Sequence, residues 1–300
     1  MTATDIMPSN AGDPAMKTCL QCHHAWDSAV WRCDACGFTP GEMDGLTAFS
    51  QVSPQGGFNP RDFETLYRIE DRHFWFRARN RLIQWALRRY FSDARDFLEV
   101  GCGTGYVLAG IRKAMPRLNL YGSELYVEGL AYARQRLPEA VFCQMDARHM
   151  PFDAEFDVIG AFDVLEHIAE DGAVLQQLHR ALHKKRGGLL LTVPQHPFLW
   201  SQADERAQHV RRYRAGELRE KVEQAGFQVL RITSFVTLPF PAMLLSRLLP
   251  KPRAQEIELD VPAWQNACLG WLLRVEAGMI QSGVSLPFGG SLLLVGQVKV

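Results

Sequence analysis

A glycine-rich turn lies between an apolar run and a helical pattern, an arrangement that can hold a cofactor. The run Phe97–Val100 leads directly into Gly101, Gly103 and Gly105. Glycine lets the backbone approach a ligand closely and adopt angles that a Cβ atom would forbid. A dinucleotide fingerprint has the longer spacing GxGxxG, whereas here the third glycine comes one residue early and Glu99 precedes the first. The turn therefore predicts a nucleoside-type cofactor other than a dinucleotide.

Acidic residues follow the next three apolar runs of the chain. The runs at residues 118–123, 141–145 and 156–162 end at Glu124, Asp146 and Asp163. In an open α/β sheet the ligand lies outside the carboxyl ends of the strands, so we expect these residues to converge. A carboxylate at the position of Glu124 could accept hydrogen bonds from both ribose hydroxyls. Together with the glycine spacing, this pattern favours S-adenosylmethionine over NAD.

Four of the seven cysteines form two CxxC pairs, Cys19 with Cys22 and Cys33 with Cys36. Four thiolates at this spacing can surround a tetrahedral ion, and in a reducing compartment the pattern favours a metal site over disulfides. A segment this short buries little apolar area, so a metal would supply folding free energy. We predict a structural zinc ion held by these four cysteines. Iron in a rubredoxin-like arrangement is the alternative.

The residues around these cysteines argue against RNA binding. Residues 1–50 contain two basic and six acidic residues, and a net negative charge repels phosphate. His23 and His24 are expected to be exposed or to lie behind the ligands. We expect a zinc-ribbon-like segment over residues 1–50 with a structural or protein-docking role, followed by a Gly-, Pro- and Ser-rich linker over residues 51–60.

Alternating apolar runs and helical patterns over the rest of the chain predict an α/β fold. Further strands are expected at residues 189–193, 227–235 and 291–296, and helices at residues 61–91, 126–137, 164–183, 213–226 and 263–281. The loop at residues 195–212 follows the fifth strand and lies at the expected ligand edge, where loops commonly carry specificity.

Five segments carry a family resemblance. FLEVGCGTGYVL, LYGSELY, QMDARHMPF, FDVIGAFDVLEHI and GGLLLTVPQHPFLWS occur in this order. With them, residues 61–300 resemble the class I S-adenosylmethionine-dependent methyltransferases of type 11/23. The resemblance implies a Rossmann-like doubly wound sheet of seven strands whose seventh strand is antiparallel. An insertion at about residues 236–288 departs from the family pattern. We expect it to pack structurally; a substrate lid, a dimer surface and a membrane-surface foot are the alternatives.

The resemblance also implies roles for the residues at the strand ends. Glu124 would hold the ribose hydroxyls, Asp146 would meet the adenine amino group, and Glu99 would orient the loop or approach the methionine ammonium. The implied cofactor-binding residues are Glu99, Gly101, Cys102, Gly103, Gly105, Glu124, Leu125, Met145, Asp146, Ala147 and Asp163.

A helix ahead of the first strand is expected to cover the cofactor, as in many members of the family. It contains the phrase HFWFRARNRLI. We expect His73, Arg77 and Arg81 in the wall of the site, and Phe74 and Trp75 in the core.

The methyl group of S-adenosylmethionine sits on a positively charged sulfur, so its transfer needs alignment and exclusion of water rather than a metal. The predicted zinc is therefore not the catalyst. A hydroxyl acceptor would benefit from a base that titrates near neutrality, which points to histidine. The candidate catalytic residues are His209, His167 and Asp163. His209, in the loop after the fifth strand, is the first choice, and His196 is a further option in that loop.

Three functions remain in competition. We expect O- or C-methylation of a small molecule or of a lipid- or glycan-linked acceptor. A ribosomal or transfer RNA methyltransferase with a zinc module is the alternative enzyme, although the fourth strand lacks an NPPY- or DPPY-like motif. A module that binds cofactor or docks a protein without catalysis is the third.

Charge and hydropathy limit the partners. Thirty-three basic residues balance 33 acidic ones, so no global field attracts nucleic acid. No secretory signal is visible, which predicts a cytoplasmic protein. The apolar stretch at residues 232–246, which contains two prolines, is shorter than the roughly 20 residues that a bilayer requires. We expect no membrane span, while contact with a membrane surface and a protein partner for residues 1–50 stay open.

Overall fold

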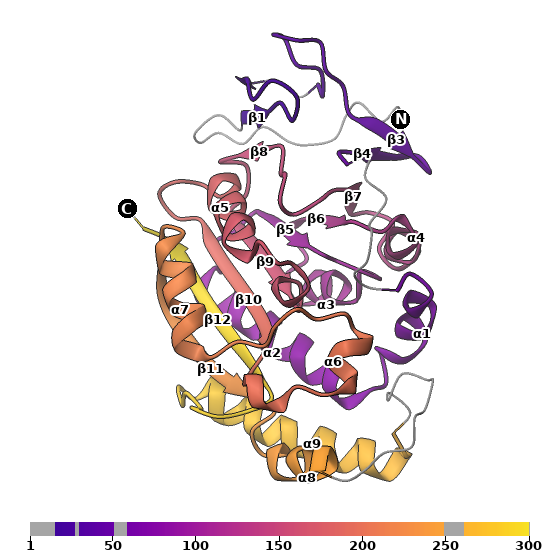
Figure 1. Ribbon diagram of the computed structural model, residues 1–300, viewed down its shortest axis with the longest axis vertical. Coiled ribbons are helices and arrows are strands. Elements are labelled where there is room, and N and C mark those ends of the chain that lie inside the picture. Colours follow the sequence, from indigo (N-terminus) through magenta and orange to yellow (C-terminus); the bar gives the residue numbers. More distant parts are fainter. Residues whose placement is uncertain (1–15, 28–29, 51–58, 249–260, 300) are drawn as a thin grey trace.

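The computed structural model describes residues 16–27, 30–50, 59–248 and 261–299. Most of the predicted linker, residues 51–58, and part of the predicted insertion, residues 249–260, lie outside the described residues. A nine-stranded sheet runs through the molecule with helices on both of its faces (Figure 1).

The large sheet has the strand order β11, β12, β10, β9, β5, β6, β7, β4, β3. Its strands are Gly41–Met43 (β3), Leu46–Ala48 (β4), Asp96–Val100 (β5), Asn119–Glu124 (β6), Val141–Gln144 (β7), Val158–Phe162 (β9), Gly188–Pro194 (β10), Phe227–Phe235 (β11) and Ser291–Val298 (β12). β12 pairs antiparallel with β10 and β11, whereas β10, β9, β5, β6 and β7 are parallel. The predicted Rossmann-like α/β sheet with an antiparallel seventh strand is confirmed.

Helices cover the sheet on both sides. The α-helices of the described part are Asp62–Ile69 (α1), Phe74–Tyr90 (α2), Tyr106–Ala114 (α3), Val127–Arg136 (α4), Asp171–Ala181 (α5), Gln202–Arg206 (α6), Ala215–Gln224 (α7), Phe240–Leu248 (α8) and Ala263–Gln281 (α9). Two short 3₁₀ helices, Leu165–His167 (η1) and Pro197–Leu199 (η2), lie in the loops after β9 and β10.

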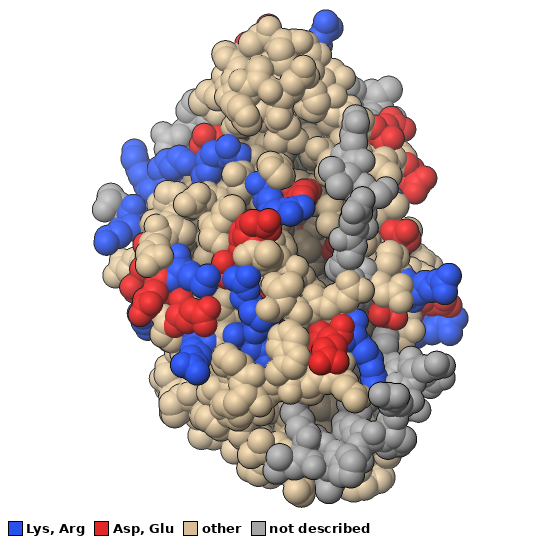
Figure 2. Space-filling view, in the orientation of Figure 1, with Lys and Arg blue, Asp and Glu red and all other residues tan. Residues whose placement is uncertain are grey.

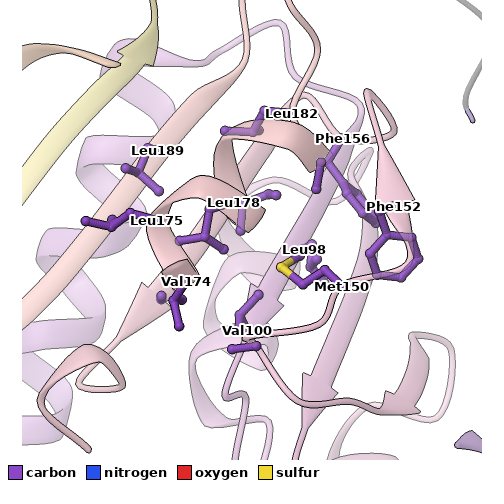
Figure 3. Packing of buried hydrophobic residues seen from close by; sticks show 14 of the residues in the cluster. Leu98, Val100, Met150, Phe152, Phe156, Val174, Leu175, Leu178, Leu182 and Leu189 are labelled. Atoms are coloured by element: carbon purple, nitrogen blue, oxygen red, sulfur yellow. The ribbon is translucent and has the colours of Figure 1, made fainter. Parts of the chain in front are cut away.

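Each central strand contributes to two hydrophobic cores, because successive side chains of a strand point to opposite faces. On β5, Phe97 belongs to one buried cluster and Leu98 to the other; on β10, Leu190 and Leu189 divide in the same way. The cluster that contains Leu98 is covered by α5 and α7, and Figure 3 shows Leu178 of α5 packed over it. The opposite cluster is covered by α2, α3, α4 and α9. Packing on both faces holds the strands in place, and with them the residues at their carboxyl ends, where the candidate site is described below.

The amino-terminal segment is paired with the sheets of the main domain. β4 pairs parallel with β7 and β3 continues the sheet as a hairpin. β1 (Met16–Thr18) lies between β2 (Ala25–Trp26) and β8 (Phe152–Asp153) in a second sheet of three strands. Figure 1 shows these elements at the top of the molecule, at the opposite end from α8 and α9.

Aromatic packing and a buried ion pair join this segment to the domain. The ring of Trp31 lies 5.8 Å from that of Phe152 in the domain and 4.6 Å from that of Phe49 within the segment, centroid to centroid. The Nζ atom of Lys17 lies 3.4 Å from Oε1 of Glu155, with both side chains 3% exposed. Burial raises the pKa of Glu155 to about 7, although the charge and hydrogen bond of Lys17 lower it. The contact between Lys17 and Glu155 therefore involves a carboxyl group that ionises at a higher pH than an exposed glutamate.

Two of the predicted helices are interrupted, so those predictions were wrong in detail. The helix expected over residues 61–91 is split into α1 and α2 because His73 is extended, with a ψ of 131°, and its ring nitrogen accepts a hydrogen bond from the Trp75 amide. The helix expected over residues 164–183 begins as η1 and resumes as α5 after Ile168, which is also extended. Both interruptions lie next to the site.

The predicted insertion contributes α8 and α9 in the described part. Leu273, Ala277 and Ile280 of α9 are buried in one cluster with Leu82 and Ala86 of α2. α9 thus packs against α2, and the structural role of the insertion stays a prediction. Among the described residues, none of the helices is both long and apolar enough to cross a membrane.

Candidate cofactor and active site

The glycine turn after β5 has the geometry that its sequence predicts. Gly101 and Gly105 have φ angles of +71° and +72°. A Cβ atom would lie 2.5 Å from a methyl carbon of Val164 at the first position and 3.0 Å from Cα of Ala133 at the second. A larger residue at either position would be strained and would displace a neighbour.

Glu124, at the end of β6, organises this turn. Its carboxylate accepts hydrogen bonds from the amides of Gly103 at 3.0 Å, Leu125 at 2.7 Å and Tyr126 at 3.2 Å. Burial raises the pKa of Glu124, and these three amide hydrogen bonds oppose that rise. A carboxylate has about four acceptor sites, so roughly one is left for a further donor. Two ribose hydroxyls would have to share these oxygens with the loop amides.

Glu99, the penultimate residue of β5, is a buried acid beneath the glycine turn. It is 2% exposed, and within the described part of the chain its Oε2 atom has no hydrogen-bond partner. Burial raises the pKa of Glu99 well above its usual range, despite the nearby charge of Arg79. An acceptor without a partner at this depth fits a cationic or hydrogen-bonding group of a cofactor.

Asp146 follows β7 and is held by Arg148. The guanidinium donates to the carboxylate at 3.0 Å from Nε and 2.7 Å from Nη2. Burial alone would raise the pKa of Asp146, but these hydrogen bonds outweigh it and lower the pKa. Met145 and Ala147 on either side are buried. Asp146 therefore presents a fixed carboxylate between two apolar residues.

Asp163, after β9, is held in the left-handed region with a φ of 57°. Its Oδ2 accepts a hydrogen bond from Thr192 at 3.1 Å and forms an ion pair with Arg79 of α2. Arg79, rather than the predicted Arg77 or Arg81, is thus the arginine that reaches the strand ends. The arginine stacks over the ring of Trp75, 4.6 Å from its centroid.

A second group of polar side chains lies one turn beyond Asp163. Ligand atoms of Glu166, His167 and His209 all lie within 4.8 Å of one another. The His167 and His209 rings meet edge to face with centroids 4.7 Å apart. Burial, and then the charge of His209, lowers the pKa of His167 to about 4.

The loop after β10 brings His209 to this group. The Nδ1 atom of His209 lies 3.0 Å from Oδ1 of Asp204, and the Val210 amide donates to the Glu166 carbonyl at 2.7 Å. Asp204 is buried and also accepts from Nε of Arg212 at 2.7 Å. The loop is therefore fixed on η1 by backbone and side-chain contacts.

Comparison with known proteins identifies this arrangement. A family model described as a methyltransferase domain matches residues 67–232, which is more than half of the chain and includes every strand end described above. The chain belongs to this methyltransferase family.

Curated relatives and solved structures agree with this assignment. A probable S-adenosylmethionine-dependent methyltransferase of Mycolicibacterium smegmatis is 28% identical over 55% of this chain and 63% of its own length. A trans-aconitate 2-methyltransferase of Azoarcus is 31% identical over 33% of this chain and 38% of its own. A chain in the solved complex between the Haloferax volcanii Trm112 methyltransferase activator and a methyltransferase has a TM-score of 0.54 and 20% identity, covering 80% of this chain and 97% of its own. The chain thus spans less than two thirds of the length of these curated relatives.

His196 and two neighbours of His209 in the sequence lie in structural positions. The His196 ring packs 4.3 Å from that of Phe288, centroid to centroid. Tyr213 is buried and donates to Asp171 at 2.8 Å, and Arg211 forms an ion pair with the same carboxylate. Among the residues that we considered for the base, His209 and His167 are the pair that lies beside Glu166.

Three residues of the site were not predicted, namely Arg79, Glu166 and Asp204. Glu166 lies in η1, three positions after Asp163, which precedes the N-cap Val164 and has a left-handed φ. Its closeness in sequence to a predicted site residue is the signal that the sequence offers. Arg79 offers none, because its partner Asp163 lies 84 residues away. Asp204 forms a capping box with Ser201 at the start of α6, a spacing that signals a helix start but not the contact with His209.

The four cysteines of the amino-terminal segment converge. Their sulfur atoms all lie within 4.8 Å of one another, with Cys19 and Cys36 3.6 Å apart and Cys22 and Cys33 also 3.6 Å apart. A tetrahedral zinc with bonds of about 2.3 Å separates its sulfur ligands by about 3.8 Å. A disulfide would require about 2.05 Å. This geometry is compatible with the predicted metal site, and His23 and His24 are exposed beside it, as expected.

Proposed function

We propose that the protein transfers the methyl group of S-adenosylmethionine to an oxygen or carbon atom of a small molecule or of a lipid- or glycan-linked acceptor. Family membership supports methyl transfer, and the observation that carries the proposal is that Glu99, Glu124, Asp146 and Asp163 lie at the carboxyl ends of the neighbouring strands β5, β6, β7 and β9. Bound S-adenosylmethionine would supply a methyl group on a positively charged sulfur.

The cofactor would lie across the carboxyl ends of β5, β6, β7 and β9. In this arrangement the turn at Gly101, Gly103 and Gly105 faces the methionine and ribose portions. Glu124 takes the ribose hydroxyls, and Asp146 meets the adenine amino group beside Met145. Glu99 accepts a donor from the methionine end. Cys102, Leu125 and Ala147 contribute backbone or apolar contacts.

The acceptor would lie beside Asp163, Glu166, His167 and His209. Asp163 is neutralised by Arg79, which leaves the two histidines and Glu166 as the groups able to bind an acceptor hydroxyl and take its proton. Asp204 fixes the orientation of His209, as a positioning carboxylate does in other proton-transferring sites. Replacement of His209 by glutamine is therefore expected to lower turnover by about 10²–10⁴ and to leave cofactor affinity nearly unchanged.

A small-molecule acceptor is favoured over RNA by two observations. One relative carries the name trans-aconitate 2-methyltransferase. Basic and acidic side chains are interspersed over the face in Figure 2 rather than gathered into one positive field. A ribosomal or transfer RNA substrate remains the alternative, and a non-catalytic module the third.

Four thiolates at the spacing of Cys19, Cys22, Cys33 and Cys36 would hold a structural zinc. The packing of Trp31 on Phe49 and Phe152 supports a stabilising role for this segment. Protein docking is the second possible role, because a solved structure with a similar fold is a complex with an activator protein. We place the protein in the cytoplasm. A membrane-surface contact would involve α9, whose Trp264 and Trp271 are 68% and 58% exposed.

The test uses cofactor that is radiolabelled in its methyl group. The protein is incubated with this cofactor and with cell extract separated into small-molecule, lipid and RNA fractions. Label that enters the small-molecule or lipid fraction and disappears with His209→Gln supports the proposal, whereas label in RNA supports the alternative. A protein that binds no S-adenosylhomocysteine in calorimetry, or that binds it and labels no fraction, would support the non-catalytic module.

A further inference from the structure

Glu166, His167 and His209 combine ligand types that bind transition metals. Their ligand atoms lie within 4.8 Å of one another, and they come from η1 and from the loop before α7. Two imidazoles and one carboxylate on one side of an ion leave further positions open for exogenous ligands. The group differs from the four cysteines, which offer only soft sulfur.

The polar atoms of this group lack the partners that burial demands. Glu166 is fully buried, and in the part of the chain that the structure describes neither of its carboxylate oxygens has a hydrogen-bond partner. The same holds for Nδ1 of His167. Leaving a buried polar group unsatisfied costs about 1–3 kcal/mol, and more when it is charged. Three such atoms in one place indicate a missing partner, either water or an ion.

The second nitrogen of each imidazole is already engaged. A carboxylate can only accept, so Nδ1 of His209 donates its proton to Asp204 at 3.0 Å, and the lone pair of the neutral ring is on Nε2. The backbone carbonyls of Ala207 and Gln208 engage the ring of His167, which leaves its unpartnered Nδ1 on the other side. A carboxylate or carbonyl behind the imidazole is the arrangement that orients metal-ligating histidines.

We propose that Glu166, His167 and His209 bind one divalent transition-metal ion, with Asp204 as the carboxylate that orients His209. Nitrogen and oxygen ligands suit manganese, iron or zinc better than a soft thiophilic ion. The ion gives the Glu166 oxygens and Nδ1 of His167 the partner that they lack. The positive charge of the ion also compensates the negative charge of the buried Glu166 carboxylate.

The position suggests what the ion does, and this step rests on the proposed function. Asp163 and Glu166 are three residues apart after β9, so the ion lies next to the expected acceptor. A divalent cation lowers the pKa of a hydroxyl group that coordinates to it, and the hydroxyl proton passes to solvent. The acceptor oxygen then forms a bond to the methyl carbon, the sulfur–methyl bond breaks, and its electron pair stays on the sulfur of neutral S-adenosylhomocysteine. The substrate class is thus a hydroxyl compound. With the ion bound, His209 is a ligand, and this role replaces that of the base described above; His209→Gln lowers turnover in either case.

The experiment is a titration of the full chain with Mn²⁺, followed by the electron paramagnetic resonance signal of the free ion. Thiolates disfavour Mn²⁺, so the zinc-loaded cysteines do not compete. We expect one Mn²⁺ bound per chain. Glu166→Gln and His209→Ala should weaken binding by about a hundredfold or more, and Asp204→Asn by about 10–100-fold. Cys33→Ser and His149→Ala, which change the other cysteine site and an exposed histidine, should bind Mn²⁺ like the parent protein.

Two outcomes overturn the proposal. One is a parent protein that binds no Mn²⁺ and gains no zinc beyond what its cysteines hold. The other is binding that survives Glu166→Gln and His209→Ala in variants with unchanged circular dichroism. If these variants do not fold, the test is the number of Mn²⁺ ions bound per parent chain together with the Mn²⁺ affinity of Asp204→Asn. No bound ion, or an unchanged affinity of Asp204→Asn, then overturns the proposal. Calorimetry with S-adenosylhomocysteine on the same samples separates the two claims, because loss of cofactor binding contradicts the proposed function without affecting the metal titration.

Discussion

The Nδ1 atom of His209 lies 3.0 Å from Oδ1 of the buried Asp204, and this contact sets the chemistry of the loop after β10. Asp204 also accepts from Arg212 at 2.7 Å and from the Ser201 amide at 2.8 Å. The hydrogen bonds of His209 and Arg212 lower the pKa of Asp204, although burial opposes them. The ionised carboxylate keeps one tautomer of His209 and directs Nε2 toward its neighbours.

Replacing Glu124 by alanine should weaken cofactor binding. Charge-assisted hydrogen bonds of this kind contribute about 1.5–3 kcal/mol, so the affinity for S-adenosylhomocysteine should fall by roughly ten- to a hundredfold in calorimetry. Glu128→Ala, which changes an exposed acid in the first turn of α4, is the matched control. Unchanged affinity of Glu124→Ala would show that β6 does not present its acid to the cofactor.

Replacing Arg79 by methionine should destabilise the fold. The variant leaves Asp163 without its ion pair, and the side chains of this pair are 10% and 18% exposed. Breaking a buried pair costs about 3–5 kcal/mol. Arg77→Met changes an exposed arginine of the same helix and should alter the free energy of unfolding by less than about 0.5 kcal/mol. Urea unfolding measures both, and equal midpoints would argue against the ion pair.

The four-cysteine site should hold one equivalent of zinc. Metal analysis of protein purified without added metal should show that Cys33→Ser loses one equivalent relative to the parent, because three thiolates hold zinc less tightly than four. Cys268→Ser, which changes an exposed cysteine of α9, should lose none. A Cys33→Ser protein with full zinc content would refute the ligand set.

Glu155 should make stability depend on pH. Burial raises its pKa in the folded protein to about 7, above the ordinary value of 4.5 for a glutamate. The folded state therefore holds the proton more tightly, and the stabilisation that it gives is complete below about pH 4.5 and is lost as the pH rises through about 7. The loss is on the order of 3 kcal/mol.

The measurement compares thermal unfolding of the parent and Glu155→Gln from pH 5 to pH 8. Glutamine cannot ionise, so the variant should gain stability relative to the parent as the pH rises. Glu42→Gln, at an exposed position, should follow the parent curve. Parallel curves for the parent and Glu155→Gln would mean that Glu155 ionises normally.

Periodic patterns predicted the sheet and its carboxyl ends well, because the strands β5, β9 and β10 are buried on both faces and their apolar runs leave little freedom. The same reasoning gave α9 its observed bounds. It failed for β3 and β4, whose short hairpin pairs with β7, about a hundred residues away. The pairing of β4 with β7 depends on the tertiary fold, so the sequence around residues 41–48 carries no pattern that predicts it.

Side-chain direction was harder to predict than the elements. Arg79 lies on the buried face of α2 and pairs with Asp163, whereas Arg77 is exposed and Arg81 is half-buried. Glu166 is three residues from the predicted Asp163, and this closeness was a usable signal. The link from Asp204 in α6 to His209 depends on how the following residues fold back.

A crystal structure of the complex with S-adenosylhomocysteine tests the account most directly. We predict that the ribose hydroxyls contact Glu124, that the adenine amino group meets Asp146, and that the sulfur faces the group formed by Asp163, Glu166 and His209 across a gap large enough for an acceptor. A ligand that leaves Glu124 untouched, or whose sulfur faces away from Asp163 with His209 turned to solvent, would contradict the proposed site.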